Sequence, residues 1–118
     1  MRENMEIKIT DANFEEEVIK SGIPVLVDFY ADWCGPCKML SPIVEQISEE
    51  YADTYLVGKV NVDEQPGLAL KYQVMSIPML VTMNLGMFAG KSIGVITKEE
   101  VLDLLHKAEV LRDQKIES

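Results

Sequence analysis

The chain has 118 residues, 47% of them hydrophobic and 26% charged, which suits one globular domain with a core of its own. Its 20 acidic residues outweigh its 11 basic residues, and the formal charge of −9 argues against binding to nucleic acid or to an anionic membrane. We find no signal peptide and no segment of transmembrane length, so we expect a cytoplasmic protein.

The N-terminal half alternates short apolar strands with amphipathic helices. Thr10 or Asp11 is a candidate helix cap, and the acidic residues that follow suit a first helical turn. A nearly continuous apolar run then predicts a strand covered on both faces. Pro42 should kink the next helix, because it removes a backbone hydrogen bond. The expected elements are a strand over 5–9, a helix over 10–21, a strand over 23–31 and a helix over 38–51.

The C-terminal half continues this alternation and then adds a hairpin. Pro66 fits the first turn of a short helix, where its missing N–H costs little. The turn at 84–86 predicts an antiparallel strand pair, and Thr97 with Glu100 forms a capping-box pattern at the start of the last helix. The expected elements are strands over 54–63, 77–83 and 87–95, and helices over 65–74 and 97–111.

This order predicts an α/β protein, with a mixed sheet and helices on both of its faces. We assign residues 1–110 to a single domain, and residues 111–118 to a helix end and a short polar tail.

The only two cysteines, Cys34 and Cys37, are three positions apart, and three interpretations compete. A disulfide staple across so short a loop would contribute about 2 kcal/mol, which a domain with this core hardly needs. A structural zinc needs four ligands, and the only histidine, His106, lies far away on the last helix. We therefore expect no metal site.

A reversible dithiol is the third interpretation and fits the local sequence best. The pair lies where a strand meets a helix, so Cys34 should occupy the helix N-terminus, where free N–H groups favour a negative sulfur. Cys37 should lie one turn later, beneath it. Pro36 suits an N-terminal turn and stiffens the loop.

The segment "DFYADWCGPCKMLSPI" closely resembles the active site of the thioredoxin family. The segment "KVNVDEQPGLALKYQV", the tripeptide "SIP" and the glycines at 86 and 94 follow in the expected order and spacing. The resemblance implies the thioredoxin fold, a five-stranded mixed β-sheet flanked by four α-helices. It also implies a protein-disulfide reductase with no cofactor beyond its own redox-active disulfide.

In that family the first cysteine attacks the substrate disulfide and the second resolves the mixed disulfide, roles that fall here to Cys34 and Cys37. The residues between them, Gly35 and Pro36, tune the redox potential, and Gly-Pro is typical of reducing members. The implied partners are disulfide-containing proteins and a thioredoxin reductase that re-reduces the pair. We expect a monomer.

Two charged residues interrupt apolar strands. Asp28 could escape at a strand end, but burial would raise its pKa and suit a general base. By resemblance it accepts the proton of Cys37. Lys59 would ordinarily be an edge residue with its ammonium in water, whereas the family places a lysine here beside the aspartate, as its modulator.

The resemblance also suggests a surface for substrates. Trp33 precedes the reactive cysteine and is expected to shield it and to contact the substrate. The Ile77–Pro78 bond corresponds to the family's cis-proline, where the residue before the proline pairs with the substrate backbone. Gly94 and Val95 should extend this apolar surface.

Four methionines depart from the family pattern, and they have two interpretations. They could fill gaps in the core, since Met adapts to irregular space. Alternatively, the first two border the site and soften its docking surface. The four are Met75, Met79, Met83 and Met87.

Two other functions stay open at this point: a disulfide isomerase or oxidase, and a binding module that uses the methionine-rich surface. A high redox potential would favour the first. Complex formation that survives loss of both cysteines would favour the second.

Overall fold

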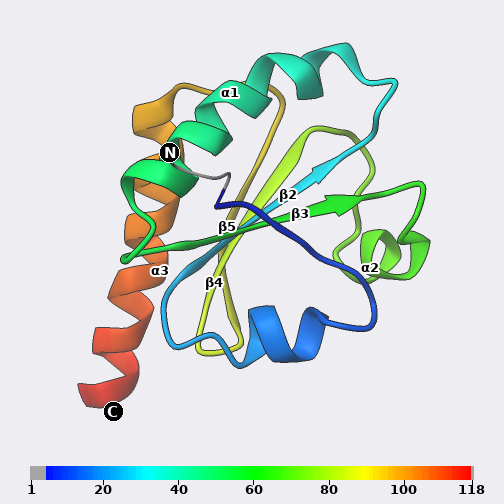
Figure 1. The fold of residues 1–118 in the computed structure, drawn as a ribbon. Helices are drawn as coiled ribbons and strands as arrows, with labels where there is room; N and C mark the ends of the chain where they lie inside the picture. The colour runs from blue at the N-terminus through cyan, green and yellow to red at the C-terminus, as the bar shows by residue number, and fades with distance from the viewer. Residues whose placement is uncertain (1–4, 118) are drawn as a thin grey trace.

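The computed structural model describes residues 5–117, and its elements follow the expected order (Figure 1). They are β1 (Ile7–Lys8), η1 (Glu15–Ile19, a short π-helix), β2 (Val25–Tyr30), α1 (Gly35–Glu50), β3 (Leu56–Asn61), α2 (Pro66–Lys71), β4 (Met79–Asn84), β5 (Met87–Ile93) and α3 (Lys98–Glu117). Within these residues, none of the helices combines the length and the apolar character needed to cross a bilayer.

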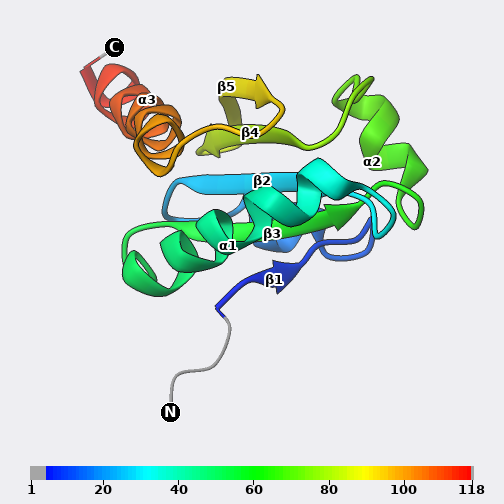
Figure 2. The ribbon, with the colours of Figure 1, turned by 90° about the horizontal axis from the view of Figure 1, so that it is seen from above.

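The five strands form one mixed sheet in the order β1-β3-β2-β4-β5. Strands β1, β3 and β2 run parallel, whereas β4 is antiparallel to β2 and β5 is antiparallel to β4. The sheet and its four helices confirm the predicted architecture. The carboxyl ends of β2 and β3 lie at the same edge of the sheet, the edge from which α1 begins (Figure 2).

Each face of the sheet is covered by a separate apolar core, as the uninterrupted hydrophobic run of β2 predicts. On one face, Phe14 before η1 and Leu68 of α2 pack against Val27 and its neighbours. On the other, Leu40 of α1 and Leu105 of α3 pack against Leu26. Successive residues of β2 therefore pack into the cores on opposite faces of the sheet.

The first helix differs from its prediction. It is confined to Glu15–Ile19, and its first residue is preceded by Phe14, with no side-chain capping bond. The expected cap was therefore wrong. Thr10 instead begins a turn, in which its N–H donates to Oδ1 of Asn13 at 2.8 Å, and the N–H of Asp11 donates to Gln65. The carbonyl oxygen of Thr10 also accepts the N–H of Phe14 at 3.0 Å, so a hydrogen-bonded turn precedes the helix.

The hairpin and the last helix follow their sequence signals. Leu85 and Gly86 have φ values of 55° and 76°, the left-handed pair that a tight hairpin turn requires. At the next helix, Glu100 Oε1 accepts the N–H of Thr97 at 3.0 Å, while Oγ1 of Thr97 accepts the N–H of Glu100. The capping box is thus confirmed, and α3 continues to Glu117, beyond its predicted end.

Candidate redox site

The two cysteines form a disulfide at the start of α1. Cys34 is the N-terminal capping residue, with extended backbone, and its Sγ accepts the N–H of Cys37 at 3.2 Å. Pro36 lies in the first turn, where no N–H is needed. The prediction of a pair at the strand–helix junction is confirmed. A negative sulfur at Cys34 would meet both the helix dipole and a backbone donor.

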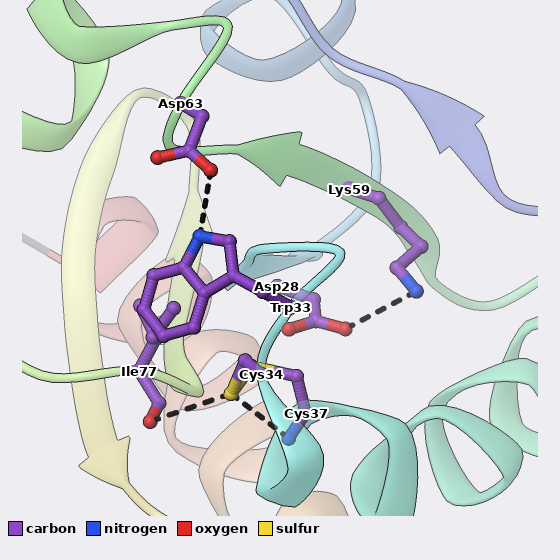
Figure 3. The surroundings of a disulfide bond; sticks show 7 residues. All are labelled: Asp28, Trp33, Cys34, Cys37, Lys59, Asp63 and Ile77. Atoms are coloured by element: carbon purple, nitrogen blue, oxygen red, sulfur yellow. Dashed lines mark hydrogen bonds and ion pairs between the residues drawn. A yellow bond between two sulfur atoms is a disulfide. The ribbon is translucent and has the colours of Figure 1, made fainter.

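The two cysteines are similarly buried, with 4% of Cys34 and 5% of Cys37 exposed. Exposure therefore does not distinguish them, but their neighbours do. Sγ of Cys34 lies 3.9 Å from the carbonyl oxygen of Ile77, to which a protonated thiol could donate (Figure 3). Cys37 instead lines a cavity of about 160 Å³ together with Tyr30 and Lys59.

The Ile77–Pro78 peptide bond is cis, as the resemblance implied. Pro78 is buried, and its carbonyl oxygen accepts the N–H of Gly94 at 2.8 Å. Gly94 has a φ of 91°, a left-handed conformation that favours glycine. This bond ties the loop that follows β5 to the residue that precedes β4, beside the disulfide.

Asp28 lies in the middle of β2 and is only 1% exposed, so its side chain does not escape at a strand end. Burial raises its pKa from an ordinary 3.8 to about 6; Lys59 opposes this rise and the charge of Glu6 adds to it. Oδ1 of Asp28 is buried without a hydrogen-bond partner among the described residues. A buried carboxyl group that titrates near neutrality can both accept and release a proton.

Lys59 lies beside Asp28 in the sheet register, and its Nζ is 3.7 Å from Oδ2 of Asp28. Nζ also lies 4.5 Å from the ring centroid of Tyr30. The edge position that is usual for a strand lysine is therefore not the one seen here. The expected proximity of Lys59 to the buried aspartate is confirmed.

Trp33 is 71% exposed, and its Nε1 donates to Oδ2 of Asp63 at 2.8 Å, which holds the indole beside the disulfide (Figure 3). The sequence reasoning missed Asp63. A signal was available, since Asp63 lies two residues after the end of β3 and the carboxyl ends of β2 and β3 share one edge.

The methionines fall into two groups. Met75 is 90% exposed in the loop before the cis bond. Met79 is 1% exposed and belongs to the core beneath β4, so its expected place on a docking surface was wrong. Met83 is likewise in the core, and Met87 is half-buried. Met79 and Met83 are four residues apart on β4, so both face the same core, as the interpretation of the methionines as gap fillers expected. Met75 precedes the strand and lies outside that alternation.

The exposed apolar residues around the disulfide include one that was not predicted. Val95 is 43% exposed, as expected of a surface residue, and Ile93 is 54% exposed at the end of β5. Pro36 is exposed between the cysteines, whereas Ile77 is half-buried.

A metal centre finds no support in the part of the chain that the structure describes, where no three potential ligands converge. His106 is exposed on α3.

Comparison with known proteins gives a consistent result. The thioredoxin family model matches residues 5–107. The chain is 44% identical to a thioredoxin of Pyropia yezoensis over 100 residues, which cover 85% of this chain and 94% of that protein. It is also 44% identical to thioredoxin 1 of Synechococcus elongatus over 99 residues, which cover 84% of this chain and 92% of that protein.

Proposed function

Because the chain belongs to the thioredoxin family and is a thiol–disulfide oxidoreductase that works by dithiol exchange, we propose a role for each residue of its site. The observation that carries the assignment is the Cys34–Cys37 disulfide at the N-terminus of α1. In the reduced protein these two thiols supply the two electrons that reduce a substrate disulfide.

Cys34 is the attacking nucleophile. Its thiolate forms a bond with one sulfur of the substrate, and the other substrate sulfur leaves with the electron pair of the broken S–S bond. The position of Cys34 at the helix terminus and the N–H of Cys37 at 3.2 Å support this choice, because both favour a negative sulfur there. The intervening Gly35 and Pro36 set the redox potential.

Cys37 resolves the mixed disulfide. It transfers its proton to Asp28, attacks Sγ of Cys34, and releases the second substrate sulfur as a thiolate. Support comes from the burial of Asp28 and from its pKa of about 6, which leaves it ionised and able to accept a proton at neutral pH. Water in the cavity that Cys37 shares with Lys59 is the proposed proton route, and Lys59 modulates the basicity of Asp28.

The substrate chain docks between the indole of Trp33 and the cis-proline loop. The backbone of Ile77 pairs with the substrate in β-like fashion, beside Pro78. Met75 offers a flexible, 90% exposed side chain that adapts to different partners. Gly94 and Val95 complete the surface, which is apolar in a chain of net charge −9.

A thioredoxin reductase restores the dithiol after each turnover, and protein disulfides are the substrates. The protein works as a cytoplasmic monomer and needs no cofactor beyond its cysteine pair. The Gly35–Pro36 pair supports a reducing role, and the comparisons do not favour an isomerase, an oxidase or a pure binding module.

The test is catalysed reduction of a protein disulfide at about pH 7, with a small dithiol as the electron source. Wild type should accelerate the reaction, Cys34→Ser should abolish the acceleration, and Cys37→Ser should accumulate a mixed disulfide. Activity no greater than that of the dithiol alone would contradict the proposal. Complex formation that persists without both cysteines would instead point to a binding module.

A further inference from the structure

A row of charged side chains crosses the three parallel strands on the face that carries Asp28. In the sheet register Asp28 lies beside Lys59, and Lys59 lies beside Lys8. Glu6 precedes Lys8 by two residues, so it belongs to the same face of the sheet. The strand order β1-β3-β2 places the strand of Lys59 between β2, which carries Asp28, and β1, which Glu6 directly precedes.

Glu6 faces the same space as Lys59. The two residues line a cavity of about 270 Å³ together with Tyr30, and Oε2 of Glu6 is buried. Nζ of Lys59 also lies 4.5 Å from the ring centroid of Tyr30 and 3.7 Å from Oδ2 of Asp28. Glu6 is thus a second acidic residue that shares a cavity with Lys59, the lysine that contacts the buried base.

The electrostatic consequence has a definite sign. Burial is the largest influence on Asp28 and raises its pKa; Lys59 lowers the pKa, and the negative charge of Glu6 raises it again. Glu6 therefore counteracts part of the stabilisation that Lys59 gives to the ionised carboxyl group. At partly buried positions such charges are weakly screened, so the interaction acts across strands.

Other charged or titratable groups border this row. Lys8 is engaged by Glu64 at 3.2 Å, on the exposed side of the cavity. The remaining ones are Tyr30 and Asp32 from β2 and the loop after it, and Cys37 and Lys38 from α1.

We propose that Glu6 is a positioning residue of the resolving step: its negative charge opposes the positive charge of Lys59 and so keeps Asp28 a strong proton acceptor for Cys37. The proposal rests on the proposed role of Asp28 as the base. It adds a residue outside the cysteine segment, on the first strand, to the set that governs how fast the mixed disulfide is resolved at neutral pH.

The experiment follows the rate of mixed-disulfide resolution from about pH 5 to about pH 9, a range that spans the titration of Asp28. Glu6→Gln should move the midpoint of the profile to lower pH by roughly half a unit, because a negative charge near Asp28 is lost. Glu6→Asp keeps the charge, so its midpoint should stay close to that of the wild type. Glu64 lines the same cavity at an exposed site. Glu64→Gln removes the same charge there and should leave the midpoint unchanged.

Two outcomes separate this inference from the proposed function. If Asp28→Asn abolishes the pH dependence and Glu6→Gln does not move it, Asp28 is the base and the role of Glu6 is overturned. If Asp28→Asn leaves the profile unaltered, the role of Asp28 itself is wrong and that of Glu6 falls with it. A shift that appears in Glu6→Gln and is absent from the Asp28→Asn, Glu6→Gln double variant supports both.

Discussion

Replacing Asp28 by Asn should stabilise the protein, although the residue lies at the centre of the site. The carboxyl group is 1% exposed, and its neighbours on β2 belong to the apolar cores. An amide of nearly the same shape keeps the packing and removes a group whose charged form burial disfavours. The gain in stability is the counterpart of the function proposed for this carboxyl group.

The magnitude follows from the pKa of Asp28. A rise from 3.8 to about 6 in the folded state corresponds to about 3 kcal/mol of destabilisation once the group is ionised in both states. This value already includes the influence of Lys59. It is an upper bound for the variant, because the new amide group brings two N–H donors into a buried site where Oδ1 of Asp28 has no hydrogen-bond partner among the described residues. Lys59 keeps its contact with the ring of Tyr30, so we expect Asp28→Asn to gain between about 1 and about 3 kcal/mol at neutral pH.

The sign of the pH dependence is fixed by linkage. Between the unfolded pKa of 3.8 and the folded pKa of about 6, the folded wild type binds more protons than the unfolded chain. The free energy of unfolding of the wild type therefore falls as pH rises through this window and is level above it. The variant lacks this fall. Its stability advantage over the wild type should therefore be absent below pH 3.8, grow as pH rises to about 6, and stay constant above that value.

Urea unfolding of the oxidised protein at a series of pH values measures this difference, provided that the slope with denaturant is unchanged. Asp53→Asn, at an exposed carboxylate, is the matched control and should follow the wild type. An advantage of the same size at every pH would mean that packing, not ionisation, is responsible. A loss of stability at neutral pH would refute the assignment of Asp28 as a buried base whose ionised form is destabilised by burial.

Three further predictions concern the methionines and a core glycine. Met79→Thr should destabilise the fold by about 2 to 5 kcal/mol, because it leaves a cavity and a hydroxyl in the core. Met75→Thr should leave thermal stability unchanged and raise KM for protein substrates more than for a small disulfide. Gly58→Ala should cost about 1 to 3 kcal/mol in denaturant unfolding, since its Cβ would lie 2.6 Å from Cγ1 of the buried Ile9. Gly22→Ala, which has open space around it, should be neutral and serves as the control.

Local signals were sufficient for the part of the site that is contiguous in the chain. The spacing of Cys34 and Cys37, with Pro36 between them, predicted a pair at a helix start, because the geometry of a first helical turn depends on adjacent residues only. The hairpin at Leu85–Gly86 was predictable for the same reason. The burial of Asp28 was also predictable, because its sequence neighbours form an apolar strand.

Pairwise relations across the sheet were decided by the tertiary structure. The positions of Met75 and Met79 on either side of Pro78 suggested a shared surface, yet Met75 is exposed in a loop whereas Met79 is a core residue of β4. Asp63 reaches Trp33, and Glu6 faces Lys59, only because parallel strands bring their ends and edges together. The sequence by itself determined the order of strands and helices through periodicity, and the cysteine pair at a helix start through local spacing. The thioredoxin fold followed from the resemblance of its segments to that family. The tertiary structure decided which distant charges surround the buried base, because burial and electrostatic coupling depend on distances between strands.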